Sequence, residues 1–212
     1  MHLETYPAFF TPRDKKPTSA HEYILSLNNR GRLLRCYTSN IDGLERECGL
    51  EYDLEGGRVV QLHGSVRHLR CNKCCETYVW EEKMEKAALE GYQIACRKCR
   101  SIPSRAGRAR RESTIGRLRT HVVGLGESWR DTDIAEHMNR DQDADPDLLL
   151  VLGTSLTADG PRDMVNRFSS AVRSNGGKVI YVNLQRPRTS KWRSLPDYWV
   201  EWDLDQWVRN LM

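Results

Sequence analysis

The sequence predicts an α/β fold, in which a parallel sheet is covered by helices and a small metal-binding module is inserted. Three observations predict it. Short runs of apolar and β-branched residues recur along the chain, and each ends in small or polar residues. Segments with helical spacing alternate with these runs, as they do in parallel sheets with helical crossovers. Residues 65–120 break this pattern and contain five of the seven cysteines.

The first predicted element is a helix near the N-terminus. Apolar residues with helical spacing follow Ser19, and the segment Asn28–Gly31 is expected to end the helix. Thr18 or Ser19 is the expected N-cap. Glu22, which comes three residues after Ser19, fits a capping box.

The predicted sheet is built from five apolar runs of strand length, and two helical segments connect some of them. The strands are expected at Leu33–Tyr37, Val59–Leu62, Val122–Val123, Leu148–Leu152 and Val179–Val182, and the helices at Trp129–Asn139 and Arg162–Ser174. Ligands of open α/β sheets bind beyond the carboxyl ends of the strands. The polar and glycine residues that follow these runs are therefore the candidate site residues.

Composition is that of a globular chain, with 39% hydrophobic residues in a length of 212. The longest apolar run has five residues, far fewer than the ~20 that a membrane span needs. The N-terminus carries no apolar region typical of a secretory signal, so neither export nor membrane contact is expected. Residues 1–64 and 121–212 are expected to form the sheet domain, and residues 65–120 the inserted module.

Two Cys-x-x-Cys pairs form the most specific motif of the chain. Cys71 and Cys74 are followed, after 21 residues, by Cys96 and Cys99. Each pair directs two thiolates toward one point, so that together they fit a closed, structural Zn²⁺ site. In a chain without an export signal, metal binding is favoured over disulfides. The alternatives are four unpaired buried thiols, or Cys75 as a ligand without the two-residue spacing.

His63 is the candidate catalytic base. It ends a predicted strand, and the glycine that follows it lets a ligand approach the backbone. A neutral imidazole with a pKa of about 6.5 is the usual general base at physiological pH. The alternative is a histidine that only satisfies a structural hydrogen bond.

Short polar residues follow three of the predicted strands. The candidate residues are Ser39, Asn40 and Asp42 after the first strand, with the apolar Ile41 between them, then Gly153, Thr154 and Ser155 after the fourth, and Asn183, followed by the apolar Leu184, after the fifth. Such side chains can hold an amide or a ribose hydroxyl, and backbone N–H groups before a helix can bind phosphate. The same residue types are also ordinary turn formers. Neither a G-x-G-x-x-G motif nor a Walker loop occurs in the sequence.

The formal net charge is only +4, so any affinity for an acidic partner depends on local clustering. The segment Arg97–Arg119 holds nine Lys or Arg residues and one acid. It is interpreted either as a solvated loop or as a contact for an acidic partner. Because no aromatic residues are interleaved with these charges, sequence-specific recognition of nucleic acid is not expected.

Taken together, these segments resemble the sirtuins, the NAD-dependent protein-lysine deacylases. The matching stretches occur in the family's order: CYTSNIDGLERECGL at 36–50, QLHGSV at 61–66, the two Cys-x-x-Cys pairs, RTHVVGLGES at 119–128, DLLLVLGTSL at 147–156 and VIYVN at 179–183. The stretches RGRLLRCYTSNIDGLE and STIGRLRTHVV look most like the fungal branch that deacetylates histone H3.

The resemblance implies a Rossmann-like NAD-binding sheet, a Zn²⁺ module, and transfer of acyl groups from histone or other protein lysines to ADP-ribose. The products are nicotinamide and O-acyl-ADP-ribose, and the nucleus is the expected location, with the cytoplasm as the alternative. By position, His63 matches the base that takes a proton from the NAD ribose. Residues 39–42 match the nicotinamide side, and 153–155 with 183–184 match the adenosine side. Leu125, Gly126 and Glu127 match the segment that pairs with the substrate peptide as an added strand.

The sequence departs from the family pattern at three places. Ser39 stands where the family normally has glutamine, and Leu125 stands where phenylalanine or tyrosine is common. The family's Gly-Ala-Gly-x-Ser loop, which cradles the diphosphate, does not occur in this sequence. We therefore expect these 212 residues to bind NAD weakly or not at all.

Two alternative functions remain. The first is a catalytically weak or inactive sirtuin remnant, which binds protein through the zinc module and the basic segment. The second is a zinc-ribbon protein that binds nucleic acid, which leaves the residues at the strand ends unexplained.

Overall fold

The computed structural model describes residues 15–51, 57–101, 114–122, 138–139, 141, 144–157, 159–185 and 195–211. Contacts divide the chain into two compact units. One is built mainly from Asn40–Gly43 and His63–Trp129, and it contains the four paired cysteines. The other is built from Lys16–Ser39, Leu44–Leu62 and Arg130–Met212.

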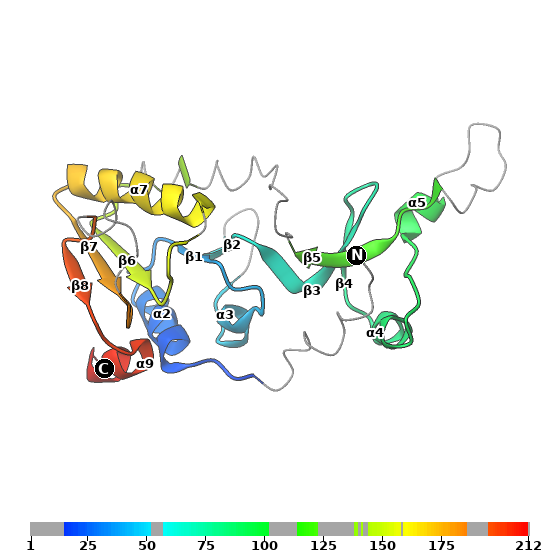
Figure 1. Cartoon of the computed structure of the whole chain (residues 1–212), viewed down its shortest axis with the longest axis horizontal. Helices are drawn as coiled ribbons and strands as arrows, with labels where there is room; N and C mark the ends of the chain where they lie inside the picture. The colour runs from blue at the N-terminus through cyan, green and yellow to red at the C-terminus, as the bar shows by residue number, and fades with distance from the viewer. Residues whose placement is uncertain are drawn as a thin grey trace. The chain divides into compact units, whose positions relative to one another are not determined.

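The second unit contains the parallel strands (Figure 1). Strands β6 (Leu148–Leu152), β7 (Lys178–Val182) and β8 (Tyr198–Val200) form a parallel sheet in the order β6-β7-β8. Strands β1 (Cys36–Thr38) and β2 (Val59–Gln61) form a parallel pair. Four of the five predicted strands are thus confirmed as parallel, although β1 starts three residues later than predicted. Strand β8 was not predicted, because three residues are too few for a recognisable pattern.

Helices cover both faces of the β6-β7-β8 sheet. Helix α7 (Asp159–Ser174) packs against β6 and β7, and it begins three residues before the predicted start. Helices α2 (Ser19–Asn29) and α9 (Leu204–Leu211) pack together. The rings of Tyr23 and Trp207 meet edge to face between them, with their centroids 6.0 Å apart. Figure 1 shows α7 on one side of the sheet and this helix pair on the other. The layered α/β arrangement expected from the sequence is therefore present in this unit.

The start of α2 corrects one prediction. Thr18 is the N-cap, so the third residue of the helix is His21 rather than Glu22. The backbone N–H of Thr18 donates to Nδ1 of His21 at 3.2 Å. A histidine thus has the capping role that was expected for the glutamate. The short helix α3 (Leu44–Glu47) lies against α2.

The first unit contains an antiparallel sheet of three strands in the order β4-β3-β5. These strands are β3 (Gly64–Cys71), β4 (Thr77–Val79) and β5 (Leu118–Val122), and the unit also has the helices α4 (Glu82–Leu89) and α5 (Arg97–Ser101). The predicted parallel strand at Val122–Val123 is wrong, because Val122 ends β5 and pairs antiparallel with Gly64. Val123 lies outside the described residues. Val122 ends a half-exposed strand, which has a weaker apolar signal than a buried one.

A buried ion pair ties the region before β6 to the start of β1. Of the predicted helix Trp129–Asn139, only Met138 and Asn139 are described, and both are helical, as is Asp141. The carboxylate of Asp141 accepts two hydrogen bonds from the guanidinium of Arg35, at 2.9 and 3.0 Å, and one from the hydroxyl of Tyr37 at 2.6 Å. Burial and the bond to Asp141 raise the pKa of Tyr37.

Replacing Asp141 with alanine is expected to destabilise the chain strongly. The side chains of Arg35 and Asp141 are only 7% and 3% exposed, so the variant leaves a buried guanidinium without its carboxylate. Breaking such a pair costs about 3–5 kcal/mol. Urea unfolding of Asp141→Ala, beside Asn139→Ala, measures the effect. Asn139 is exposed and accepts a hydrogen bond from the exposed Arg167, so equal losses in the two variants would contradict this prediction.

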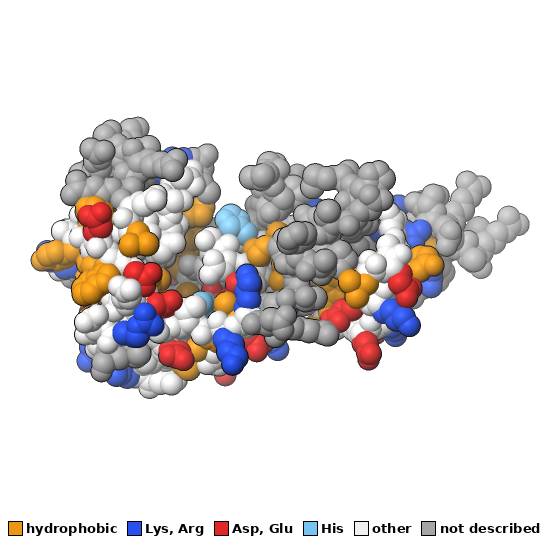
Figure 2. Space-filling view, turned by 60° about the horizontal axis from the view of Figure 1, so that its bottom comes forward, with side chains coloured by type: hydrophobic (Ala, Val, Ile, Leu, Met, Phe, Trp, Pro, Cys, Tyr) orange, Lys and Arg blue, Asp and Glu red, His pale blue; other side chains and the backbone are white. Residues whose placement is uncertain are grey.

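Within the part of the chain that the structure describes, no helix is long and apolar enough to cross a lipid bilayer. Figure 2 shows Lys and Arg side chains lying among Asp and Glu side chains on the visible surface.

Candidate functional site

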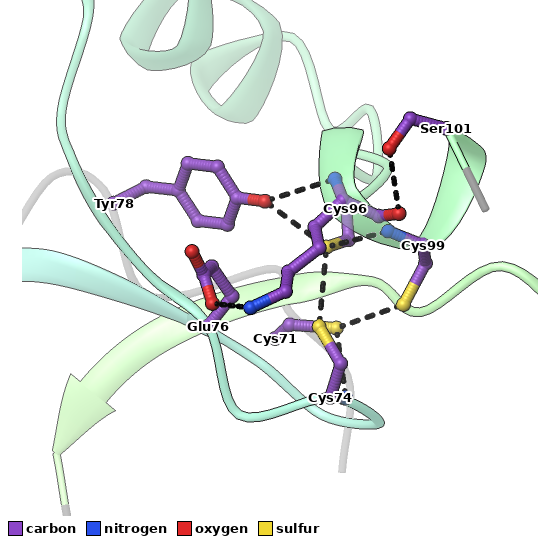
Figure 3. Close-up of polar contacts among 8 residues, drawn as sticks. Cys71, Cys74, Glu76, Tyr78, Cys96, Cys99 and Ser101 are labelled. Carbon is purple, nitrogen blue, oxygen red and sulfur yellow. Dashed lines mark hydrogen bonds and ion pairs between the residues drawn. The ribbon is translucent and has the colours of Figure 1, made fainter.

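The structure brings Cys71, Cys74, Cys96 and Cys99 together (Figure 3). Cys71 is the last residue of β3, and Cys74 lies in the turn toward β4. Cys96 directly precedes α5, and Cys99 lies within it. Their four Sγ atoms all lie within 4.8 Å of one another. The antiparallel sheet and one short helix thus deliver the four thiols to one point.

The spacing of the sulfurs fits a tetrahedral zinc ion. Zn–S bonds of about 2.3 Å give S–S edges of about 3.8 Å. The Sγ atoms of Cys71 and Cys99 are 3.7 Å apart, and those of Cys74 and Cys96 are 3.6 Å apart. Four thiolates fill the tetrahedron, so the ion would have a structural role. Cys75 is exposed and lies outside the cluster, so it is not a ligand in this arrangement.

The surroundings shift the pKa values of two of the four thiols in opposite directions. Burial raises the pKa of Cys96, but hydrogen bonds from the hydroxyl of Tyr78 and the N–H of Cys99 lower it to about 7. The backbone at Glu76 lowers the pKa of Cys74, whereas burial and the neighbouring thiols raise it, to about 12. A bound cation such as Zn²⁺ would favour the thiolate form of these sulfurs.

Gly116 lies against the cluster, although it was not among the residues predicted from the sequence. A Cβ atom at this position would lie 2.2 Å from Sγ of Cys71 and 3.2 Å from Sγ of Cys99. The backbone carbonyl of Gly116 also accepts a hydrogen bond from the N–H of Cys96 at 2.8 Å. Only glycine can pass this close to two ligands, but a single glycine in a basic segment gives no such signal in the sequence.

We expect Gly116→Ala to lose zinc and stability together. The added methyl group must displace a ligand sulfur, and overpacking of this kind costs at least ~1–3 kcal/mol. Zinc content and thermal unfolding of the purified variant test this. The matched control is Gly160→Ala, since a Cβ atom at Gly160 meets nothing within 4 Å. A Gly116→Ala protein with full zinc content and an unchanged midpoint would show that the cluster adapts to the methyl group.

The segment after β1 is attached to the strand that follows His63. The N–H of Val66 donates to the carbonyl of Ile41 at 3.0 Å, and Nε of Arg67 donates to the carbonyl of Asp42 at 3.0 Å. His63 is half-buried in the turn before β3. The structure therefore holds the predicted residues 40–42 in the same unit as His63. Ser39 and Asn40 are exposed. Arg67, which holds the carbonyl of Asp42, was not among the residues predicted from the sequence.

The residues after β6 and β7 lie at the same end of the parallel sheet. The N–H of Gly153 donates to the carbonyl of Val182 at 3.0 Å. Tyr181 donates its hydroxyl proton to the carbonyl of Thr154 at 2.6 Å, and Nδ2 of Asn183 donates to the Tyr181 oxygen at 2.8 Å. The amide nitrogen of Asn183 thus holds this loop in place. Ser155 and Leu184 are exposed beside it.

The predicted substrate residues lie outside the described part of the chain, and the basic segment lies partly outside it. The predicted substrate residues Leu125, Gly126 and Glu127 are among those not described. Of the basic segment, Arg97 contacts Glu81 at 2.6 Å and Lys98 contacts Glu76 at 2.5 Å. These two positive charges are therefore compensated within the module.

The sequence is similar to that of known members of the Sir2 family. Residues 4–159 match the sequence profile of the Sir2 family. The chain is 34% identical over 213 residues to the NAD-dependent histone deacetylase HST3 of Saccharomyces cerevisiae. The aligned region covers 92% of this chain and 48% of that protein. It is 35% identical to the HST3 protein of Candida albicans, over 92% of this chain and 44% of that protein. The chain spans about half the length of these relatives.

Solved structures share the fold. The structure of Sir2Tm bound to a propionylated peptide superposes with a TM-score of 0.70 at 22% identity, over 96% of this chain and 73% of that one. A structure of Sir2 with 2'-O-acetyl-ADP-ribose and a deacetylated p53 peptide gives a TM-score of 0.68 at 22% identity, over 96% and 74% of the two chains. The expected Rossmann-like α/β fold is thereby confirmed.

Proposed function

Because the chain belongs to the Sir2 family, we propose that it is an NAD-dependent protein-lysine deacetylase that acts on histone lysines. It would transfer the acyl group to ADP-ribose and release nicotinamide. The observation that carries the proposal is the attachment of residues 41–42 to the start of β3, directly after His63. The names of the fungal relatives, NAD-dependent histone deacetylases, support the histone substrate and a nuclear location.

In this proposal His63 is the general base, which accepts a ribose hydroxyl proton on an imidazole nitrogen. Asn40 and Asp42 would hold the nicotinamide and its ribose, together with Ser39 and Ile41. The hydrogen bonds from Val66 and Arg67 hold the backbone carbonyls of Ile41 and Asp42, so the backbone of that segment would need little reordering when NAD binds. Bound NAD supplies the anomeric carbon that the acyl oxygen attacks.

On the adenosine side, Gly153, Thr154 and Ser155 would contact the phosphates and the ribose, with Asn183 and Leu184 beside them. These residues lie at the carboxyl ends of β6 and β7, where dinucleotides bind in open α/β sheets. The exposed backbone at Gly153 and the exposed Ser155 fit a polar ligand there. Leu125, Gly126 and Glu127 would pair with the acylated peptide, and residues 65–120 would form the module that holds Zn²⁺.

The proposal is tested by incubating the chain with NAD and an acetylated histone H3 peptide. Mass spectrometry should find nicotinamide, O-acetyl-ADP-ribose and deacetylated peptide in equal amounts, with slow turnover because weak binding of NAD is expected. A reaction without NAD is the control. Deacetylation that proceeds without NAD, or that releases acetate while NAD stays intact, would overturn the proposal.

A further inference from the structure

The two cysteine pairs differ in how the first sulfur of each is hydrogen-bonded. In the first pair, the backbone N–H groups of Lys73 and Cys74 both point at Sγ of Cys71, at 3.4 and 3.5 Å. In the second pair, the N–H of Cys99 donates to Sγ of Cys96 at 3.4 Å. The N–H two residues after Cys96 belongs to Lys98, and it is directed elsewhere.

The hydroxyl of Tyr78 occupies the position between that N–H and the sulfur. The N–H of Lys98 donates to Oη of Tyr78 at 3.1 Å, and Oη lies 3.2 Å from Sγ of Cys96 (Figure 3). A zinc-bound thiolate carries no proton, so the hydroxyl is the donor in this contact. Because Oη also accepts the N–H of Lys98, its single proton is directed at the sulfur.

The surroundings hold this hydroxyl in position. Tyr78 lies in β4, and its ring packs against the core of the module, which includes Leu69, Cys96 and Cys99. Nζ of Lys98 forms an ion pair with Glu76 at 2.5 Å, which fastens α5 to the segment just before β4. The hydroxyl therefore reaches Cys96 from a fixed side chain rather than from a mobile one.

We propose that Tyr78 is a positioning residue of the zinc centre. Its hydroxyl accepts the N–H of Lys98 and donates its own proton to the Cys96 thiolate, and this second hydrogen bond slows zinc loss. A hydrogen bond to a ligand sulfur stabilises its negative charge and holds the sulfur in the position that the metal needs. Removing groups that support metal ligands typically costs 10–100-fold in metal affinity. The proposal concerns retention of the metal and does not depend on deacetylation.

The test compares zinc release to a chromogenic chelator from the wild-type chain and from Tyr78→Phe, which keeps the ring. Release should be about tenfold faster from the variant. In the Co²⁺-loaded proteins, the sulfur-to-metal charge-transfer band should move to longer wavelength, because a thiolate without this hydrogen bond is a better electron donor. The control is Tyr92→Phe, since Tyr92 is 67% exposed in the same module.

A second variant is expected to change the rate of zinc release in the opposite direction. 3-Fluorotyrosine at position 78 keeps the ring and donates a stronger hydrogen bond, so at neutral pH it should release zinc more slowly than wild type. The proposal is overturned if Tyr78→Phe matches wild type in release rate and Co²⁺ spectrum. It is equally overturned if Tyr78→Phe fails to fold with zinc in excess while the fluorinated chain behaves as wild type, since the hydroxyl would then serve the fold alone.

Discussion

Cys96→Ser is expected to release the zinc ion and unfold the antiparallel module. A serine hydroxyl is a poor zinc ligand, and structural zinc contributes about 10–16 kcal/mol of apparent binding free energy to folding. The ligands are also part of the core, because Cys71, Cys96 and Cys99 are buried together with Leu69 and Leu118. Loss of one ligand therefore removes the metal and loosens the packing at the same time. Metal analysis should find well under one equivalent of zinc.

Cys75→Ser is the matched control for this experiment. Cys75 is the immediate neighbour of a ligand, but its thiol is exposed and lies outside the cluster. This variant should keep one zinc per chain and the wild-type unfolding transition. If both serine variants retained their zinc, the metal could not be held by the cluster that contains Cys96.

The elements that could be predicted from the sequence are those with local signals. Leu148–Leu152 is a continuous apolar run, and it forms β6 with the predicted bounds. The two-residue spacing of each cysteine pair, together with the absence of an export signal, predicted a four-thiolate cluster, and the structure brings those thiols together. In both cases the information lies within a few neighbouring residues.

The features that were missed depend on contacts between residues far apart in the sequence. Arg35 and Asp141 are 106 positions apart, and no spacing pattern links them. The pairing of Arg70 with Arg119 places two like charges opposite each other, which no local pattern predicts. Gly116 matters because it lies against the sulfur of Cys71, which is 45 residues earlier in the chain. Tyr78 matters because the N–H of Lys98 is directed at its hydroxyl. Such features appear only once the chain is folded.

His63→Ala is expected to lower NAD-dependent deacetylation by ~10²–10⁴-fold, the usual contribution of a general base. The residue lies in the turn between β2 and β3, and Gly64 after it has a φ of 74°, a backbone conformation that favours glycine. Alanine removes the proton acceptor and leaves the hydrogen bonds of Val66 and Arg67 to the segment after β1 in place. The variant should therefore keep its zinc and its unfolding midpoint while kcat falls.

The histidine control separates a chemical role from a structural one. His21→Ala removes the side chain that accepts the N–H of Thr18 at the start of α2, and loss of a cap costs about 0.5–2 kcal/mol. This variant should lower the unfolding midpoint slightly and leave turnover unchanged, the opposite of the His63→Ala result. Wild-type turnover by His63→Ala would place the base at another residue. A fall in turnover matched by lost zinc or stability would instead make His63 a structural residue, because the imidazole would then be needed to hold the turn before β3.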